Sequence, residues 1–213
     1  MEVIIFLSRV EINTKRKATM KFLSSLQVMH ASVENCFTED NTRKLWRLDY
    51  FKNAYYILIL SANKPDLSVI KEQYGFQEQV VNDVMDYERV LDLLQNGQVW
   101  RFRLRANPVH SVKKGQNPEF SRGKVYPHIT VEQQKIWLLE RSEKLGFSIK
   151  NFDIVQREVK KFKRQDKFVT LSMATYEGIL EVEDVDIFRK TLTTGVGKAK
   201  AYGCGLLTLA RIR

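Results

Sequence analysis

The side chains best suited to chemistry in this sequence are arginines that alternate with aromatic and aliphatic residues. The segment Trp100–Arg105 reads WRFRLR, and successive side chains of a β-strand point to opposite faces. Arg101, Arg103 and Arg105 would therefore share one face, with about 6.6 Å between neighbours. Guanidinium groups in such a row repel one another unless an anion or nearby acidic side chains balance them. The pattern predicts phosphate contacts, or a face that is solvated or paired with acids.

A second basic segment, Lys160–Lys167, reads KKFKRQDK and is predicted to form the tip of a β-hairpin. A protruding basic ribbon can contact phosphates along an RNA groove, although the deep, narrow major groove of A-form RNA resists sequence reading by side chains. The alternative is a flexible, exposed turn. The hairpin residues expected to bind RNA are Lys160, Lys161, Lys163, Arg164 and Lys167.

Two glycine-containing segments complete the basic pattern. Arg122–His128 reads RGKVYPH, a loop whose charges and aromatic ring suit a contact to phosphate and base; His128 could touch RNA there, whereas His110 is expected at the surface. Gly195–Leu207 reads GVGKAKAYGCGLL, and its glycine spacing fits neither a P-loop nor a dinucleotide fingerprint. We expect instead a turn whose backbone approaches another surface closely. The basic residues of these two segments are Arg122, Lys124, Lys198 and Lys200.

The charge of the whole chain favours a polyanionic partner. The 213 residues include 35 Lys and Arg against 25 Asp and Glu, which gives a net charge of +10. Such a surplus favours nucleic acid, because each phosphate that is neutralised releases condensed counterions. Residues 1–107 hold 15 basic and 13 acidic side chains, whereas residues 108–213 hold 20 and 12. We therefore expect the second half to contact most of the phosphates.

Other classes of protein are disfavoured. No apolar run reaches the roughly 18–20 residues of a membrane span, and Val3–Leu7 reads as a strand rather than a signal peptide. Cys36 and Cys204 lie far apart without paired metal-ligand spacing, so we expect reduced thiols in a cytoplasmic protein. No HExxH, Cys-His or carboxylate pattern typical of a metal site is present, and we expect neither metal nor cofactor.

The elements that would position these residues occur twice in the same order. We expect an α+β protein of two tandem ferredoxin-like βαββαβ domains, residues 1–107 and 108–213, of which the second is more basic. The ferredoxin-like sheet is also the platform of the RNA-recognition motif. In the first domain the predicted strands are Val3–Ile12, Leu45–Asp49, Tyr55–Ser61 and Val99–Arg105, and the predicted helices are Lys17–Asn35 and Tyr87–Gln95. In the second the strands are 108–112, 152–163, 168–182 and 206–212, and the helices are 131–144 and 184–193.

Three segments resemble, in order, the CasE proteins of type I-E CRISPR systems: Arg101–Pro108 (RFRLRANP), Arg122–Pro127 (RGKVYP) and Gly195–Leu207. Leu7–Val10 (LSRV) and Tyr176–Gly178 (YEG) are similar to two further strands of that family. The resemblance spans nearly the whole chain and implies two ferredoxin-like domains. It also implies a metal-independent endoribonuclease that binds the stem-loop of a CRISPR repeat and cuts the precursor RNA at the 3′ base of the stem.

The resemblance further implies a mechanism and partners. In this family the 2′-hydroxyl attacks the adjacent phosphorus in line, leaving a 2′,3′-cyclic phosphate and a 5′-hydroxyl. The protein must orient the nucleophile, neutralise the phosphorane and help the leaving oxygen gain a proton. The protein then stays bound to its product as a subunit of the Cascade complex. By resemblance, Lys160–Lys167 and Arg101–Arg105 would contact the stem, and the glycine-rich turn would shape the RNA-binding cleft.

The sequence departs from the family at the expected catalytic histidine. Family members usually carry it on the first helix, three residues after a tyrosine; aligning residues 7–35 puts Phe22 and Ser25 in these two places. His30 matches a second histidine of some members. Along one continuous helix, five residues rotate a side chain by about 140° net, so His30 would not simply replace Ser25. Either the alignment slips and His30 transfers the proton, or the histidine is absent and the chain is a hairpin-RNA-binding subunit with weak or no cleavage.

Overall fold

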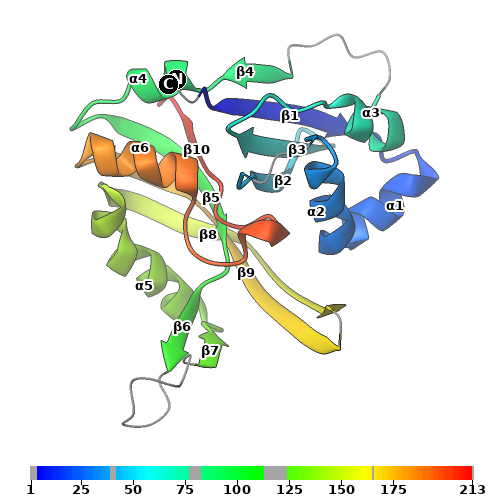
Figure 1. Ribbon diagram of the computed structural model, residues 1–213. Helices are drawn as coiled ribbons and strands as arrows, with labels where there is room; N and C mark the ends of the chain where they lie inside the picture. The colour runs from blue at the N-terminus through cyan, green and yellow to red at the C-terminus, as the bar shows by residue number, and fades with distance from the viewer. Residues whose placement is uncertain (1–3, 39–41, 77–82, 113–123, 165, 213) are drawn as a thin grey trace.

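The computed structural model describes residues 4–38, 42–76, 83–112, 124–164 and 166–212. In these ranges the chain is an α+β protein with two antiparallel four-stranded sheets and a separate two-stranded sheet (Figure 1). The predicted α+β class is therefore confirmed. None of the helices in the same ranges has the length and apolar character that a membrane crossing requires.

The first sheet has the strand order β2-β3-β1-β4, and its three pairs are antiparallel. Of its central strands, β3 is mostly apolar, and β1 buries every second side chain over Ser8–Ile12, as a strand with one buried face does. β2 and β3 are joined by Lys52 and Asn53, whose φ angles are 49° and 62°, as in the two-residue type I′ turns that suit the twist of a hairpin. The strands are β1 (Phe6–Ile12), β2 (Leu45–Phe51), β3 (Ala54–Ser61) and β4 (Val84–Asp86).

The helices of the first half are α1 (Lys17–Ser24), α2 (Leu26–Glu34), α3 (Ser68–Tyr74) and α4 (Glu88–Asp92). The predicted single helix Lys17–Asn35 is wrong, because Ser25 interrupts it with φ −123° and ψ 112°. The Oγ of Ser25 accepts a hydrogen bond from the backbone N of Val28 at 3.3 Å, which satisfies a free donor at the start of α2. The apolar stripe survives the break, since Phe22 and Met29 are both buried.

The second sheet has the order β10-β5-β9-β8, again with antiparallel pairs. β5 was expected to close the first domain, but it pairs with β9 and β10, and β4 is the fourth strand of the first sheet. Figure 1 shows α5 and α6 on one face of the second sheet. The elements are β5 (Val99–Ala106), α5 (Val131–Ser142), β8 (Phe147–Arg164), β9 (Lys167–Val182), α6 (Val185–Thr194) and β10 (Leu207–Ala210). Shorter pieces are β6 (Val109–Val112), β7 (Lys124–Pro127) and the 3₁₀ turns Glu143–Leu145 and Lys200–Tyr202.

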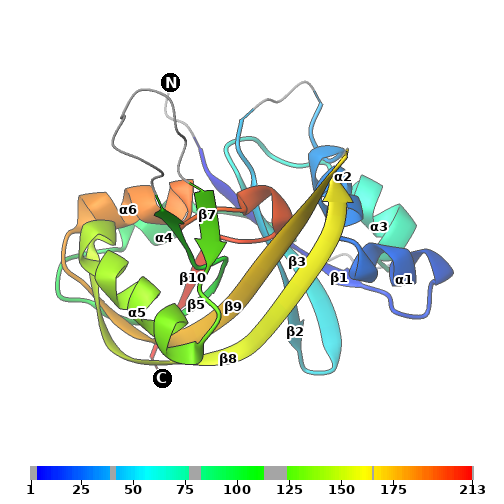
Figure 2. The ribbon, with the colours of Figure 1, turned by 90° about the horizontal axis from the view of Figure 1, so that it is seen from below.

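The hairpin of β8 and β9 joins the two halves of the molecule. Figure 2 shows these strands running from the second sheet across to α2. One apolar core lies between the second sheet and its helices, with Trp137 and Phe188 at its centre. The other lies under the first sheet and also contains Leu171 and Met173 of β9. Because its middle is buried in the first core, the hairpin is held against α2 rather than projecting freely.

Candidate nucleic-acid interface

His30 faces the glycine-rich segment across a pocket of about 690 Å³. The histidine projects from α2, and its side chain is 37% exposed. The other walls come from the residues just before β2 and from the turn that precedes β10. The lining residues are His30, Glu34, Thr42, Arg43, Lys44, Gly197, Lys198, Ala199, Lys200 and Ala201. The imidazole thus stands among four basic side chains from two segments that lie far apart in the sequence: Arg43 and Lys44 in one, Lys198 and Lys200 in the other.

The imidazole of His30 is held by packing rather than by a strong hydrogen bond. Its Nδ1 lies 3.7 Å from Oε1 of Glu34 one turn along the helix, which is beyond hydrogen-bonding range. Its ring meets the edge of Tyr202, with 6.4 Å between the centroids. Within the described part of the chain Nδ1 has no hydrogen-bond partner. Imidazole is the side chain most often used for general acid–base catalysis.

Lysines of the glycine-rich segment bring positive charge to this pocket. Lys200 donates from Nζ to the carbonyl oxygen of Thr194 at 2.6 Å. Burial, and then the nearby charge of Arg43, lower the pKa of Lys200. Lys198 is exposed, and its backbone pairs with Asn107 at the end of β5. Cations fixed in this way stabilise negative charge that develops on a phosphate during reaction.

Glycines let this segment lie directly against β2; the sequence predicted the close approach but not which surface the segment meets. A Cβ on Gly195 would come within 2.8 Å of Leu45, and one on Gly203 within 2.7 Å of Trp46. Both glycines also have positive φ, 76° and 74°, a region that disfavours side chains. The pocket around His30 therefore depends on the close approach of two segments about 150 residues apart.

Replacing Gly203 by alanine should destabilise the fold more than the same change at Gly97. Gly97 also has positive φ, 80°, but a Cβ there would meet nothing within 4 Å. The Gly97→Ala variant therefore measures the backbone cost alone, and Gly203→Ala adds the clash with Trp46. Overpacking of this kind costs typically about 1–3 kcal/mol. Urea unfolding should show that difference in the free energy of unfolding between the two variants. Equal losses of stability would mean that β2 shifts to accommodate the added Cβ at little cost.

Ser25 occupies a different place from His30. With Lys160, Lys161 and Phe162 of β8 it lines a hollow of about 80 Å³ at the start of α2. Its hydroxyl caps the helix, so the side chain has a structural role. Because the chain is extended at this position, the rotation expected along a continuous helix does not apply. The structure thus brings His30, and not Ser25, into the pocket of the glycine-rich segment.

The basic hairpin lies beside α2, close to both positions. Nε2 of Gln27 donates to the carbonyl oxygen of Lys163 at 3.0 Å. Phe162 packs on Tyr202 at a centroid distance of 4.9 Å, and Tyr202 in turn contacts His30. Lys160 is ion-paired with Glu158 at 2.8 Å.

The outer face of the hairpin carries the charges available to a ligand. Lys163 is 61% exposed on its side chain, and Lys161, also exposed, lies 4.9 Å from the ring centroid of Phe168. A cation beside an exposed ring suits contacts with phosphate and base. The side chains of Arg164 and Lys167 lie outside the described part of the structure.

The arginine row is largely neutralised by acids. Arg103 lies between Asp49, at 3.2 Å, and Glu177. Arg105 is 8% exposed on its side chain and pairs with Glu158. At these two positions the structure shows the acidic pairing that the sequence predicted as one alternative, and a phosphate contact there stays a prediction.

Arg101 is the exposed member of the row. It borders a hollow of about 660 Å³ together with Phe51 at the tip of the β2–β3 hairpin. Among the described residues no hydrogen-bond or ion-pair partner is recorded for it. Arg101 therefore keeps its predicted availability to an anion, whereas its two neighbours in the row are already balanced.

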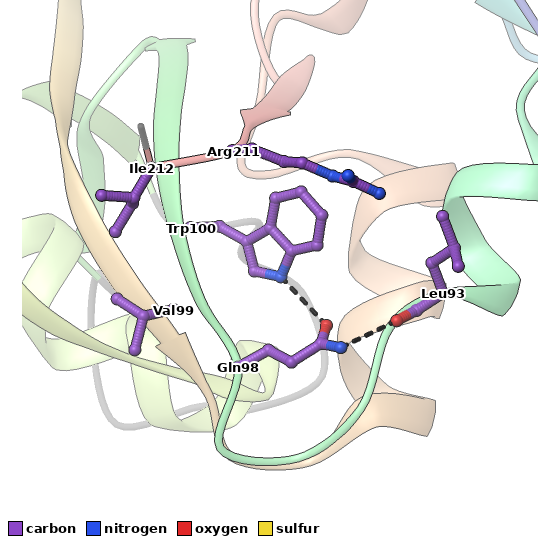
Figure 3. Close-up of a pocket in the computed structure, with 6 residues that line it drawn as sticks. All are labelled: Leu93, Gln98, Val99, Trp100, Arg211 and Ile212. Atoms are coloured by element: carbon purple, nitrogen blue, oxygen red, sulfur yellow. Dashed lines mark hydrogen bonds between the residues drawn. The ribbon is translucent and has the colours of Figure 1, made fainter.

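Trp100, at the start of the same strand, lines a separate hollow of about 330 Å³ (Figure 3). Its indole nitrogen donates to Oε1 of Gln98 at 3.2 Å, and Nε2 of Gln98 donates to the carbonyl oxygen of Leu93 at 2.9 Å. Most of the remaining lining is apolar. None of the predicted site residues lines this hollow, and we do not include it in the candidate interface.

Aromatic side chains gather on the short sheet of β6 and β7. His110 lies 4.8 Å from His128 and 6.0 Å from Tyr126 between ring centroids. Arg122 lies outside the described residues, as does the side chain of Lys124. Burial, followed by the charges of His110 and Arg141, lowers the pKa of His128.

The lowered pKa of His128 gives a testable pH dependence. A histidine whose pKa is lower in the folded than in the unfolded state stabilises the fold fully above the unfolded pKa, about 6.5. That contribution is lost as the pH falls through the folded value, because protonation then favours the unfolded chain. We expect the wild type to lose more stability than His128→Gln between pH 7 and pH 5, as measured by urea unfolding. Parallel curves for the two proteins would contradict this.

Among the described residues, neither the two cysteines nor the acidic side chains form a further centre. Cys36 and Cys204 are buried free thiols, which confirms that they are unpaired. In the described ranges no three His, Cys, Asp or Glu side chains lie close enough together to hold a metal ion.

An imidazole beside several cations, with a basic hairpin next to its helix, is an arrangement typical of nucleic-acid-binding proteins. The profile of the family described as CRISPR associated protein matches residues 5–211. The chain therefore belongs to the CRISPR associated protein family, and its resemblance to the CasE type is confirmed.

Curated relatives and solved structures agree with this membership. The CRISPR-associated endoribonuclease Cse3 of Thermus thermophilus is 29% identical, over 97% of this chain and 100% of the relative. The CRISPR system Cascade subunit CasE of Escherichia coli is 31% identical, over 61% of this chain and 67% of the relative. Cse3 bound to a 19-nucleotide RNA has a TM-score of 0.81 at 28% identity, covering 98% of this chain and 100% of that one. Thermus thermophilus Cse3 bound to an RNA representing a pre-cleavage complex has the same TM-score and coverage at 27% identity.

Proposed function

We propose that this chain is a metal-independent endoribonuclease that binds the repeat stem-loop of precursor CRISPR RNA and cuts it, with His30 as the proton-transfer residue. The observation that carries the proposal is the position of His30 in one pocket with Arg43, Lys198 and Lys200. Family membership supports the RNA substrate, since the relative Cse3 is a named endoribonuclease and has been solved with a pre-cleavage RNA.

In the proposed reaction the 2′-hydroxyl attacks the neighbouring phosphorus in line. His30 either takes the proton of that hydroxyl or supplies a proton to the departing 5′ oxygen; each is general acid–base work, worth roughly 10²–10⁴-fold in rate. Lys198 and Lys200 balance the extra negative charge on the pentavalent phosphorus. The products are a 2′,3′-cyclic phosphate and a free 5′-hydroxyl.

The basic hairpin is proposed to bind the stem. Its outer lysines, Lys161 and Lys163, are exposed next to α2, so a stem lying along them would enter the pocket of His30 at its base. Arg101 offers a further phosphate contact on the second sheet. The remaining predicted RNA-binding residues, which keep this role as proposals, are Arg103, Arg105, Arg122, Lys124, Lys160, Arg164 and Lys167.

The domains are proposed to be two ferredoxin-like units. If α1 and α2 count as one helix and α4, the β6–β7 pair and the 3₁₀ turns are set aside, each half has the order strand, helix, strand, strand, helix, strand. The sheets run β2-β3-β1-β4 and β10-β5-β9-β8. Both sequences of strands correspond to the order two, three, one, four of that fold. Because β5 is the first strand of the second sheet, we propose a boundary just before Val99 in place of Asn107-Pro108.

The names of the relatives support the proposed partners, and the location is a further proposal. The Escherichia coli relative is named as a Cascade subunit, and we propose that this chain likewise stays on its product RNA with other Cascade subunits in the cytoplasm. The alternative function is a hairpin-RNA-binding subunit with weak or no cleavage because Ser25 stands in the place of the family histidine. Ser25→His separates the two: a large gain in rate at unchanged affinity would support the alternative.

The test is incubation of the purified chain with its own repeat RNA in excess EDTA. We expect a single cut that leaves a 2′,3′-cyclic phosphate, and no cut in a matched RNA with a 2′-deoxy nucleotide at the scissile position, because that RNA lacks the nucleophile. Survival of full-length, protein-bound RNA would overturn the cleavage. A hairpin bound no more tightly than unstructured RNA at physiological salt would overturn the stem-loop substrate.

A further inference from the structure

Arg47 of β2 is a buried charge that the proposed reaction does not use. Its side chain is 2% exposed. It starts on the first sheet and reaches the second one. Taking a charged group out of water is costly unless it is paired and fully hydrogen-bonded, so its surroundings show what it holds together.

Each of the five N–H groups of Arg47 meets an acceptor. Nε and Nη2 donate to the two carboxylate oxygens of Asp49, both at 2.8 Å. Nη1 donates to the carbonyl oxygens of Arg103 at 2.8 Å and Leu206 at 2.9 Å. The second hydrogen of Nη2 goes to Oγ1 of Thr208 at 2.8 Å. A guanidinium has five donors in a fixed planar fork, so this geometry admits one relative placement of β2, β5 and β10.

The residues just before the strand of Arg47 form part of the His30 pocket. Arg43 and Lys44, four and three residues before Arg47, line that pocket. On the opposite side of Arg47, Leu206 lies near the end of the glycine-rich segment, which also holds Lys198 and Lys200. Gly205, the residue before it, donates its backbone N to the carbonyl oxygen of Arg105 at 2.7 Å. Arg47 therefore links the two walls of the pocket through one rigid group.

We propose that Arg47 is a positioning residue: its guanidinium fixes the glycine-rich lysines opposite His30, and so sets the geometry of the cleavage pocket. This inference rests on the proposed function for its effect on cleavage, but not for the contact itself. Displacing a reacting group by about 1 Å can cost roughly 10²-fold in rate. Lys161 and Lys163, which are proposed to bind the stem, are not among the hydrogen-bond partners of Arg47, so RNA affinity should be spared.

The test uses Arg47→Lys, which keeps the charge but loses the fork, and Arg47→Ala, which leaves a guanidinium-sized hole. The matched control is Arg89→Lys on α4, whose side chain is 84% exposed. For Arg47→Lys we expect the single-turnover cleavage rate at saturating repeat RNA to fall about 10²-fold, with Kd within about threefold of wild type. Millimolar guanidinium chloride should restore part of the rate to Arg47→Ala, and urea at equal concentration should not.

Hydrogen exchange of the Val196 and Gly205 amides provides a readout that needs no cleavage. We expect faster exchange at these amides in Arg47→Lys than in Arg89→Lys, with global unfolding still cooperative. If the wild type does not cut RNA, the proposed function fails while this readout still decides on Arg47. Unchanged exchange, a cleavage rate within about threefold of wild type, or a parallel loss of rate and affinity would each overturn the positioning role.

Discussion

His30→Ala should bind repeat RNA almost as tightly as the wild type and cut it about 10²–10⁴-fold more slowly. The substitution removes the imidazole from the pocket that holds Arg43, Lys198 and Lys200, and leaves the lysines of the hairpin in place. His30 packs on Tyr202 at the rim and is partly exposed, so its loss should not unfold the chain. Single-turnover rates and Kd values, measured separately at one salt concentration, check both halves of this expectation.

Two matched variants sharpen the result. Ser25→Ala removes the helix cap and should cost about 0.5–2 kcal/mol of stability, with the cleavage rate within a few-fold of wild type. His110→Gln removes an imidazole of the β6–β7 sheet and should leave the rate unchanged at neutral pH. If His30→Ala cuts as fast as the wild type, His30 is not the proton-transfer residue. A large rate loss in Ser25→Ala would return that role to the start of α2.

Local patterns predicted much of the basic surface. The basic segment Lys160–Lys167 between two predicted strands identified the hairpin, because such features depend on neighbours in the sequence. The close approach of the glycine-rich segment was also predicted, since glycines without a fingerprint spacing suggest backbone packed on a surface. The surface that it meets, Leu45 and Trp46 of β2, is distant in the sequence and left no local signal.

The errors lie where tertiary contacts override local spacing. The stripe of Phe22, Met29 and Val33 keeps helical spacing across Ser25, and so concealed a break that the serine hydroxyl stabilises. That break invalidates the rotation used to separate Ser25 from His30. The sequence pattern of β5 is compatible with a place in either four-stranded sheet. Only its pairing with β9 assigns it to the second sheet.

The acidic partners of the arginine row could not be predicted from the local sequence either. Asp49 and Glu158 lie about 50 residues from Arg103 and Arg105, on other strands. Nothing in the alternating pattern WRFRLR shows which arginine meets an acid and which meets solvent. The sequence therefore predicted either phosphate contact or acidic pairing for the arginine row. The pairing of the strands decides which arginine meets an acid and which stays exposed.

Replacing Lys161 and Lys163 by glutamine should weaken binding of the repeat hairpin by roughly 10- to 100-fold near physiological salt. Both side chains are on the exposed face of the hairpin, where they are available to two phosphates of a stem. The plot of log affinity against log salt should become shallower by about 1.8, since each neutralised phosphate contributes about 0.9. Filter binding or anisotropy from 50 to 300 mM salt measures this slope.

The control for net charge is Lys144→Gln with Lys190→Gln, which removes two exposed lysines from the side of the second sheet that carries its helices. If only total charge mattered, both double variants would lose the same affinity and the same slope. We expect the control to keep nearly all of both, because counterions are released only where side chain and phosphate meet. At saturating RNA the hairpin variant should still cut at close to the wild-type rate, since His30 and the glycine-rich lysines are untouched. If the cleavage rate of the hairpin variant at saturating RNA fell together with its affinity, the hairpin lysines would contribute to the cleavage step as well as to binding of the stem.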